Sequence, residues 1–256
     1  MQWIDKQRLQ TEVLTGTFVN LASATSTEIV AGVGFDWMVL DYEHGSDILS
    51  GLRPQLLACR GSKTASLVRL PSLDTDAAKF VMDSGAAGVM IPFVQNAEQA
   101  RAAVACLKYP PEGTRGVASA IRATGYTRNW KSYFETANQH GTVVVQIETP
   151  AAVANADAIA QVDGVDVLFV GPLDLSVNLG HPAEFEHPKV VEALEHVVDA
   201  CRRHKRCPGI LTKPGLEADC VQQGFRFVAS GSDVNAVLDG MQANLRRLQD
   251  VLPAGG

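Results

Sequence analysis

Residues 142–147 read TVVVQI and residues 167–170 read VLFV, and these two runs decide the fold class. Both are short, rich in β-branched side chains and almost continuously apolar, without alternating polar residues. Such a run is typical of a strand that is buried on both faces, as in a parallel sheet covered by helices. The two runs therefore predict a parallel α/β architecture.

Runs of the same kind recur along the chain, and stretches with helical spacing separate them. Residues 97–107 and 190–198 are examples of the predicted helices. Gly34, Gly85 and Gly224 stand where a helix would end and turn into the next strand. About eight strands are expected, at residues 15–21, 36–40, 64–70, 88–91, 142–147, 166–170, 208–211 and 226–229.

Strands that alternate with helices over 256 residues predict a single (β/α)8 TIM barrel, with residues 1–256 as one domain. The rival fold is an open doubly wound sheet, which is disfavoured because no Gly-x-Gly-x-x-Gly follows the first strand. One segment, residues 108–141, interrupts the alternation and contains the sequence YPPEGTRG. We expect this segment to be irregular and to lie over the mouth of the barrel.

Composition narrows the functional classes. Hydrophobic residues make up 46% and charged residues 20% of the chain, which disfavours disordered and disulfide-stapled proteins. The net charge of −6 gives no electrostatic footprint for nucleic acid or for a membrane surface. Five cysteines without a Cys-x-x-Cys pair, and an N-terminus without the apolar core of a signal peptide, predict a cytoplasmic protein.

Polar residues follow the predicted strands at their carboxyl ends, where a barrel of this kind places its active site. A charge that is buried there needs a partner, a metal or solvent, because an unpaired buried charge is costly. The polar groups are DYEH at 41–44, Arg69, Gln146 with Glu148, GPLD at 171–174 and SGSD at 230–233.

Glu148 and Asp174 end adjacent predicted strands. Neighbouring strands lie ~4.8 Å apart, so both carboxylates can reach one ion. Two carboxylates leave several coordination positions open, which suits Mg²⁺ or Mn²⁺ better than a closed zinc site. The alternative is that Glu148 caps a loop and Asp174 caps the next helix.

Arg69 and His44 are the candidate charged groups for catalysis. Arg69 carries a permanent positive charge that could stabilise an enolate or clamp a carboxylate; the alternative is a structural ion pair with Asp41 or Glu43. His44 lies just beyond a strand and beside carboxylates, as a general acid or base would. The alternative for His44 is a satisfied structural histidine.

In these motifs the chain resembles the HpcH/HpaI aldolase family, which are metal-dependent class II pyruvate aldolases. The family includes 4-hydroxy-2-oxoheptanedioate aldolase and 2-dehydro-3-deoxygalactarate aldolase. The resemblance covers almost the whole chain. It rests on AGVGFDW at 31–37 with DYEH at 41–44, Val68 with Arg69, YPP at 109–111 with GTRG at 113–116, QIE at 146–148 and GPLDLS at 171–176.

The resemblance implies reversible aldol cleavage of a 4-hydroxy-2-oxo acid to pyruvate and an aldehyde. Glu148 and Asp174 would hold a divalent metal, Mg²⁺ or Mn²⁺ with Co²⁺ as a further candidate, and the metal would chelate pyruvate and its enolate. Gln146 would orient the ligands. The substrate-binding set that it implies is Arg69, Gln146, Gly171, Pro172, Leu173 and Asp174, where backbone amides would receive the pyruvate carboxylate.

The catalytic set that the resemblance implies is His44, Arg69 and Asp83. Arg69 would stabilise the enolate, and His44 would belong to the acid–base apparatus, paired with Asp83. The predicted strands place Asp83 before the fourth strand, at the wrong face of its own barrel. We therefore expect Asp83 to act in a neighbouring subunit.

Three residues depart from the family pattern: Phe18 stands in place of Trp, Tyr42 in place of a small residue, and Lys213 in place of a small or apolar one. Lys213 is the only lysine expected on the catalytic face, so a Schiff-base mechanism is an alternative to the metal. An exposed loop lysine is the simpler interpretation. A second positive charge near the mouth could also select an anionic aldehyde such as a semialdehyde.

The last predicted helix carries an apolar stripe that can cover the barrel or pack on another subunit. Family relatives assemble as trimers or hexamers through this end of the chain, so the resemblance implies a homo-oligomer. The stripe consists of Val234, Leu238, Met241, Leu245 and Leu248.

Two other functions stay open. A lyase that acts on a CoA ester, like the citrate lyase β relatives, would need a basic groove for the nucleotide, and the acidic composition disfavours one. A catalytically inactive barrel that binds pyruvate is disfavoured because Glu148, Asp174, Arg69 and His44 are all present.

Overall fold

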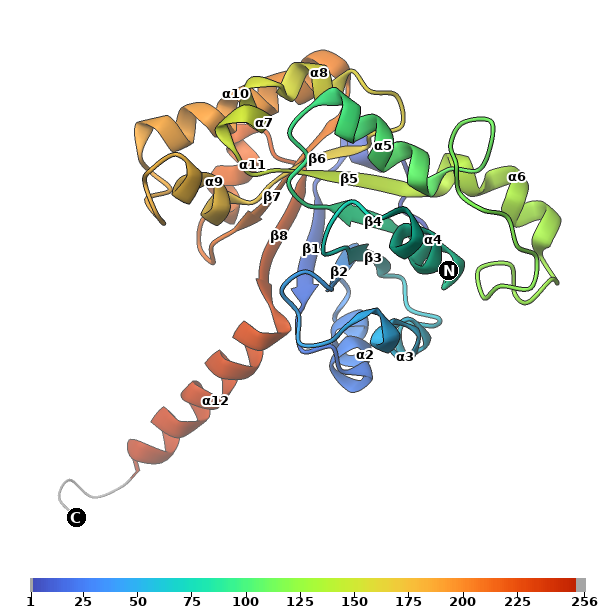
Figure 1. Cartoon of the computed structure of the whole chain (residues 1–256). Coiled ribbons are helices and arrows are strands. Elements are labelled where there is room, and N and C mark those ends of the chain that lie inside the picture. Colours follow the sequence, from blue (N-terminus) through green and yellow to red (C-terminus); the bar gives the residue numbers. More distant parts are fainter. Residues whose placement is uncertain (1, 252–256) are drawn as a thin grey trace.

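A closed barrel of eight parallel strands forms the centre of the molecule (Figure 1). The computed structural model describes residues 2–251. Each strand pairs in parallel with the next, and the last pairs with the first. The predicted (β/α)8 fold is confirmed, and the predicted strand ends fall within three residues of the observed ones. The strands are β1 (Leu14–Val19), β2 (Trp37–Asp41), β3 (Ala65–Arg69), β4 (Gly88–Ile91), β5 (Thr142–Ile147), β6 (Val167–Val170), β7 (Cys207–Thr212) and β8 (Phe227–Ser232).

Helices pack around the outside of this barrel, apart from the last one, which projects away from it (Figure 1). Gly34 and Gly224 cap two of them in the left-handed conformation, with φ of 110° and 115°, as the sequence predicts. The helices are α1 (Arg8–Thr11), α2 (Ala24–Val33), the 3-10 turn η1 (Leu49–Gly51), α3 (Leu52–Ala58), α4 (Thr75–Asp83), α5 (Ala97–Leu107), α6 (Trp130–His140), α7 (Pro150–Ala154), α8 (Ala156–Ala160), α9 (Pro172–Asn178), α10 (Pro188–His204), α11 (Glu217–Gln223) and α12 (Asp233–Gln249).

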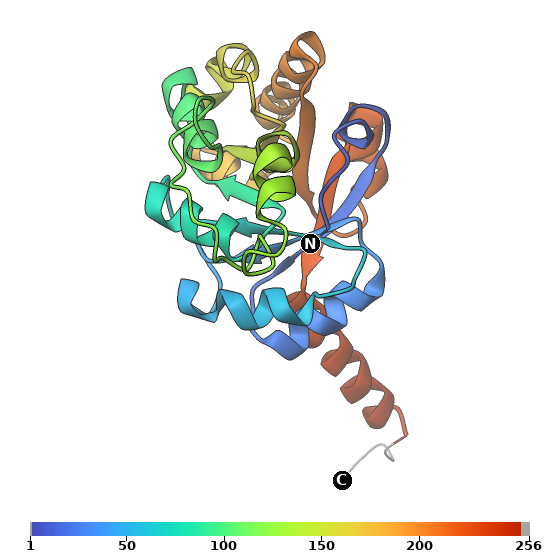
Figure 2. The same ribbon diagram turned by 90° about the vertical axis from the view of Figure 1, so that its right-hand side faces the viewer.

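Large aromatic side chains fill the inside of the barrel. The ring of Trp37 stacks on that of Phe227 with centroids 3.8 Å apart, and the edge of Phe169 meets Trp37 at 6.2 Å. Gly16 lies opposite Trp37 in the register of β1 and β2 and leaves space for the indole. The N-terminal segment crosses one end of the barrel (Figure 2), where Ile4 joins the interior cluster. The interior is therefore packed at one end and open to a site only at the other.

Residues 108–141 do not lie over the barrel mouth, so this prediction was wrong. The segment follows α5 and precedes β5, which places both of its ends at the amino ends of the strands. Ala123 N donates to Asp83 O at the end of α4, over 3.1 Å. The segment is also not wholly irregular, because it contains α6. In a barrel, only segments that follow a strand reach the carboxyl ends.

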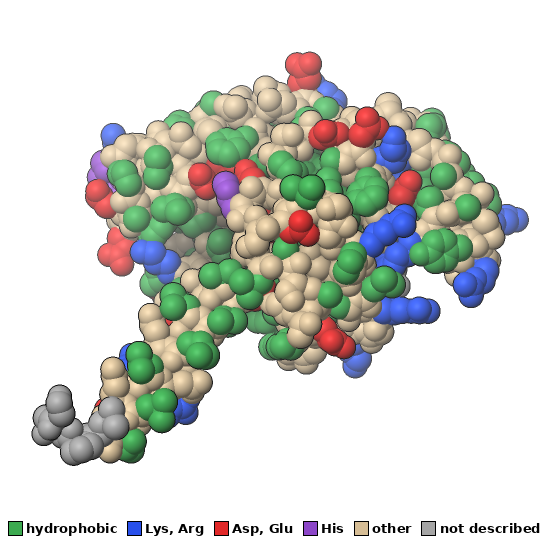
Figure 3. Space-filling model, turned by 60° about the horizontal axis from the view of Figure 1, so that its bottom comes forward, with side chains coloured by type: hydrophobic (Ala, Val, Ile, Leu, Met, Phe, Trp, Pro, Cys, Tyr) green, Lys and Arg blue, Asp and Glu red, His purple; other side chains and the backbone are tan. Residues whose placement is uncertain are grey.

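The C-terminal helix α12 carries an apolar stripe that its own chain leaves largely exposed. Figure 3 shows hydrophobic side chains along its length. Leu238, Met241, Leu245 and Leu248 expose 52, 63, 55 and 64% of their surface, and Asp233 is the one buried residue of the helix. Within residues 2–251, none of the helices combines the length and the apolarity that a membrane span requires.

Substitution of Gly16 by Ala tests the packing of the barrel interior. The added Cβ would lie 2.2 Å from Cε2 of Trp37, so we expect the free energy of unfolding to fall by about 1–3 kcal/mol. A Cβ at Gly32, inside α2, meets no atom within 4 Å, and Gly32→Ala should instead stabilise the protein by up to about 1 kcal/mol. Chemical denaturation measures both. Equal stabilities of the two variants would contradict this account of the core.

Candidate active site

A cavity of about 500 Å³ opens at the carboxyl ends of the strands. It brings together all but one of the predicted site residues. These residues come from four strands, or from the loops after them, namely β2, β3, β5 and β6. The exception is Asp83. The predicted residues that line the cavity are His44, Arg69, Gln146, Glu148, Gly171, Pro172, Leu173 and Asp174.

Glu148 directly follows β5 and is 2% exposed. Gln146 Nε2 donates a hydrogen bond to its Oε1 over 2.6 Å, and Phe93 N donates to its Oε2 over 3.3 Å. Burial, and then the negative charges of Asp174 and Glu43, raise the pKa of Glu148 to about 8. Glu148 is therefore a buried acid that lacks enough positive charge around it.

These residues fit a hard divalent cation. Glu148 and Asp174 offer carboxylate oxygens to one cavity, and the buried Oε1 of Gln146 has no hydrogen-bond partner within residues 2–251. Oxygen donors of this kind, with room for further ligands, are those that Mg²⁺ and Mn²⁺ prefer. The alternative of helix capping finds no support at Asp174, because no side chain caps α9. A loop contact at Glu148 exists, through Phe93 N, and is compatible with metal binding.

Gly171 is required by the position of Glu148. A Cβ built on Gly171 would lie 2.3 Å from Glu148 Oε1, which is closer than any real contact of this type. Pro172 then begins α9, whose first turn carries Asp174. Gly171 thus lets the backbone approach the Glu148 carboxylate, and Pro172 begins the helix that brings the Asp174 carboxylate to the same cavity.

Arg69 is held by two carboxylates. Its Nε and Nη2 donate to the two oxygens of Asp41 over 2.8 and 2.7 Å, and its Nη1 lies 3.0 Å from Glu43 Oε2. Although burial opposes it, the hydrogen bonds and charge of Arg69 hold the pKa of Asp41 below its ordinary value. The guanidinium lies 5.1 Å from the centroid of the Phe18 ring, a cation–π contact. The structural ion pair therefore exists, and it fixes Arg69 at the wall of the cavity.

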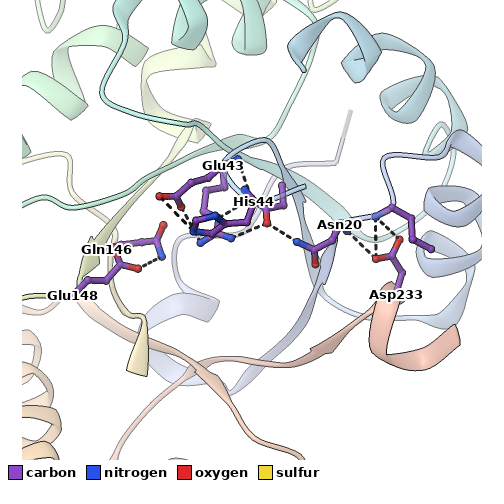
Figure 4. A network of polar contacts seen from close by, with 9 residues as sticks. Asn20, Glu43, His44, Gln146, Glu148 and Asp233 are labelled. Carbon is purple, nitrogen blue, oxygen red and sulfur yellow. Dashed lines mark hydrogen bonds and ion pairs between the residues drawn. The ribbon is translucent and has the colours of Figure 1, made fainter. Parts of the chain in front are cut away.

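Asn20, which lines the cavity, and Asp233 extend this network (Figure 4). Asn20 Nδ2 donates to Asp41 Oδ2 over 2.5 Å, and Asn20 N donates to Asp233 Oδ1 over 2.8 Å. Asn20 is not among the site residues predicted from the sequence, although it is a polar residue directly after β1, as Glu148 is after β5. The network therefore connects the start of α12 to Arg69.

His44 presents its imidazole to solvent at the edge of the cavity. Its side chain is 65% exposed, and its Nε2 lies 3.9 Å from Glu43 Oε1. This is the one polar contact of the ring within the described chain, so the interpretation of His44 as a satisfied structural histidine has little support. An exposed imidazole at this place can exchange protons with a bound molecule.

Asp83 lies at the opposite face of the barrel from His44. It is the last residue of α4, and its Oδ1 accepts a hydrogen bond of 2.6 Å from Arg115 Nη2. Arg115 is itself buried against the rings of Tyr109 and Tyr133. Within one chain, Asp83 and His44 are therefore not partners.

The three departures from the family pattern lie in different surroundings. Phe18 lines the cavity beneath Arg69, and Lys213 lines its rim after β7. Tyr42 does not reach the cavity, because it is buried in the layer between sheet and helices, where its hydroxyl accepts from Gln55 Nε2 over 2.5 Å. Only Phe18 and Lys213 can influence the choice of substrate directly.

Residues 14–240 match the family described as HpcH/HpaI aldolase/citrate lyase. The chain is 41% identical over 234 residues to 5-keto-4-deoxy-D-glucarate aldolase from Enterobacter sp. (strain 638), which covers 90% of both chains. Its structure is similar to that of an HpcH/HpaI aldolase from Desulfitobacterium hafniense DCB-2, with a TM-score of 0.90, 32% identity and 99% of each chain covered. A family protein from Burkholderia cenocepacia J2315 gives a TM-score of 0.91 at 31% identity, over 95% of this chain and 98% of that one.

Substitution of Gly171 by Ala tests whether the close approach to Glu148 matters for metal binding. We expect the variant to bind Mn²⁺ about 10-fold or more weakly, because the new Cβ displaces the Glu148 carboxylate. Isothermal titration calorimetry measures the affinity. Gly240→Ala in α12 is the control, since a Cβ there meets no atom within 4 Å. Equal Mn²⁺ affinity in the two variants would show that Glu148 is not a ligand.

Proposed function

The chain belongs to the HpcH/HpaI aldolase/citrate lyase family and is a carbon–carbon lyase, and we propose that it cleaves a 4-hydroxy-2-oxo acid reversibly to pyruvate and an aldehyde. The observation that carries the proposal is the convergence of Glu148, Asp174, Arg69 and His44 on one cavity. Numbered from its keto end, the 5-keto-4-deoxy-D-glucarate in the name of the Enterobacter relative is itself a 4-hydroxy-2-oxo acid.

Glu148 and Asp174 are the proposed ligands of a divalent cation, Mg²⁺ or Mn²⁺ with Co²⁺ as a substitute. Such a cation, when bound, supplies a Lewis acid that polarises the keto group of the substrate. The turn of residues 171–174 lines the same cavity, and we place the carboxylate of the 2-oxo acid against its backbone N–H groups. Gln146 holds Glu148 in position through the hydrogen bond between their side chains.

His44 and Arg69 carry the proton and the charge in the proposed cleavage. His44 accepts the proton of the 4-hydroxyl group, the bond between C3 and C4 breaks, and the aldehyde leaves. The bonding electrons pass to the three-carbon fragment as the enolate of pyruvate, which is then protonated at C3. Arg69 stabilises the enolate oxygen, because Asp41 and Glu43 hold its guanidinium beside the cavity.

We infer that the active unit is a homo-oligomer, a trimer or a hexamer, that forms in the cytoplasm. The exposed stripe of α12 supports association, since apolar patches of this kind are rare on monomers. Association would also allow Asp83 to pair with His44 of a neighbouring subunit, which a single chain prevents. All five cysteines are buried free thiols, in keeping with a reducing compartment.

Charge inserted into the stripe tests the role of α12. The double variant Leu238→Glu with Met241→Glu should have a lower molar mass in solution than the wild type, because carboxylates would be buried in the interface. Multi-angle light scattering measures the mass. Arg247→Glu changes the net charge by the same amount on the other side of the helix and should leave the mass unchanged. A monomeric wild type would contradict the proposed oligomer.

Pyruvate release from a panel of 4-hydroxy-2-oxo acids tests the proposed function. Activity should be lost with EDTA and return with Mg²⁺, Mn²⁺ or Co²⁺, whereas Glu148→Gln should stay at least about 1000-fold less active with any metal. Glu98→Gln, an exposed acid on α5, should behave as the wild type. Activity that ignores EDTA, with borohydride trapping at Lys213, would replace the metal by a Schiff base. Pyruvate binding without turnover would instead identify a binding barrel.

A further inference from the structure

Two histidines and a glutamate gather in the loop between α9 and α10 (Figure 1). The candidate ligand atoms of His181, Glu184 and His187 all lie within 4.8 Å of one another. Among residues 2–251, this is the one group of three His, Cys, Asp or Glu side chains that is compact enough to share an ion. The proposed aldolase reaction uses none of the three, so the cluster can serve another purpose.

Two consecutive turns of the backbone bring these side chains to one side of the loop. Glu184 N donates to His181 O and His187 N donates to Glu184 O, each over 3.1 Å. Hydrogen bonds between residues i and i+3 place side chains three positions apart above one another. Ser176 fastens the loop to α9, because its backbone O accepts from His181 N over 2.8 Å and its Oγ accepts from Ala183 N over 3.0 Å. The spacing of three residues between the ligands is therefore the physical cause of the cluster.

The three side chains can close around an ion. The imidazole rings of His181 and His187 stack with centroids 3.4 Å apart and an angle of 17° between their planes. His181 Nδ1 lies 3.9 Å from Glu184 Oε2, and the Glu184 side chain is 61% exposed. Ligand atoms around a tetrahedral zinc ion lie about 3.4 Å apart, since each bond is ~2.1 Å long. Rotation of the exposed glutamate side chain can cover the remaining distance.

We propose that His181, Glu184 and His187 form a metal site of their own, which binds Zn²⁺. Two imidazole nitrogens and one carboxylate suit Zn²⁺, whereas Mg²⁺ prefers oxygen donors. The site thus differs in its donor atoms from the proposed pair Glu148 and Asp174. A cavity of about 330 Å³ borders Glu184 and His187 and leaves room for a water molecule as the fourth ligand.

The charges around the cluster favour a cation. Glu184 and Glu186 contribute two carboxylates to the lining of this cavity, and Lys213 contributes one ammonium. The ammonium is itself engaged with an aromatic ring, because Lys213 Nζ lies 4.2 Å from the centroid of Phe185. Negative charge therefore exceeds positive charge beside the proposed ligands.

One existing contact must be given up when a metal binds. His187 Nδ1 accepts a hydrogen bond from Lys189 N at the start of α10, over 3.3 Å. An imidazole that binds a metal through one nitrogen carries a proton on the other, so either mode of binding removes this acceptor. The contact is long and Lys189 is exposed, so water can take its place at low cost.

An ion at this site would fix part of the wall of the active-site cavity. Ala183 and Phe185 lie between the ligands in the sequence and line the cavity of about 500 Å³. A metal that joins His181 to His187 holds the loop at both ends, so the backbone between them should open less often. The proposal does not depend on the aldolase reaction, because none of the three ligands takes part in it.

Isothermal titration calorimetry of the metal-free protein with Zn²⁺ tests the proposal. The wild type should bind one Zn²⁺ ion that His181→Ala binds at least about 10-fold more weakly or not at all. Glu184→Gln should weaken the same binding event, and it keeps the shape of an exposed side chain, so it does not endanger folding. Zn²⁺ that enters the active-site cavity contributes equally in every variant. His196→Ala removes an exposed histidine of α10 outside the cluster and should bind Zn²⁺ as the wild type does.

Hydrogen–deuterium exchange gives an independent readout. Zn²⁺ should slow the amide exchange of residues 182–187 in the wild type and in His196→Ala, but not in His181→Ala. Excess Mg²⁺ should not slow it in any of them. Equal numbers and affinities of bound Zn²⁺ in the wild type, His181→Ala and Glu184→Gln would overturn this proposal and leave the aldolase function intact.

Discussion

A buried carboxylate, Glu148, lies beside a second one, Asp174, and this pair of like charges is the constraint on which the site depends. Burial and the charge of Asp174 both favour the protonated form of Glu148. Both acids are therefore ionised together only if a positive charge lies beside them. Gly171 allows the backbone to come close to Glu148, and the amide of Gln146 holds one of its oxygens. In the proposed mechanism, a divalent cation bound between the two acids would supply that positive charge and the Lewis acid for the reaction.

The chain does not resolve this conflict with its own residues. Arg69 is the nearest permanent positive charge, but Asp41 and Glu43 already engage it. Asn20 donates a hydrogen bond to Asp41, and Asp233 accepts one from the backbone of Asn20, so both residues support this group of charges. Arg69 is therefore held in place by its own partners, which is why we propose a metal, and not the arginine, as the counter-charge of the two acids. A barrel can hold Arg69 apart from the two acids, because Arg69, Glu148 and Asp174 come from the ends of three different strands.

Much of this could be predicted from the sequence because barrel topology is simple. Continuous apolar runs mark strands, and a polar residue at the end of each run must face the carboxyl-terminal mouth, so Arg69, Glu148 and Asp174 were found together. The segment of residues 108–141 was misplaced because length and composition were given more weight than its position after a helix. The direction of Tyr42 depends on which layer the chain enters after β2, and sequence spacing does not determine this. Asp83 pairs with Arg115 within this chain, and its proposed pairing with His44 would need a second subunit, which one sequence does not describe.

Exchange of the methyl protons of pyruvate with deuterated water tests the central claim most directly, because it needs neither an aldehyde nor a hydroxy-oxo acid. Nuclear magnetic resonance follows the loss of the methyl signal. The account predicts rapid exchange by the wild type with Mg²⁺ or another non-paramagnetic divalent metal, none above background with EDTA, and none in Glu148→Gln with metal. Exchange that persists with EDTA and in Glu148→Gln would contradict the assignment of the two buried acids as the metal site that forms the enolate.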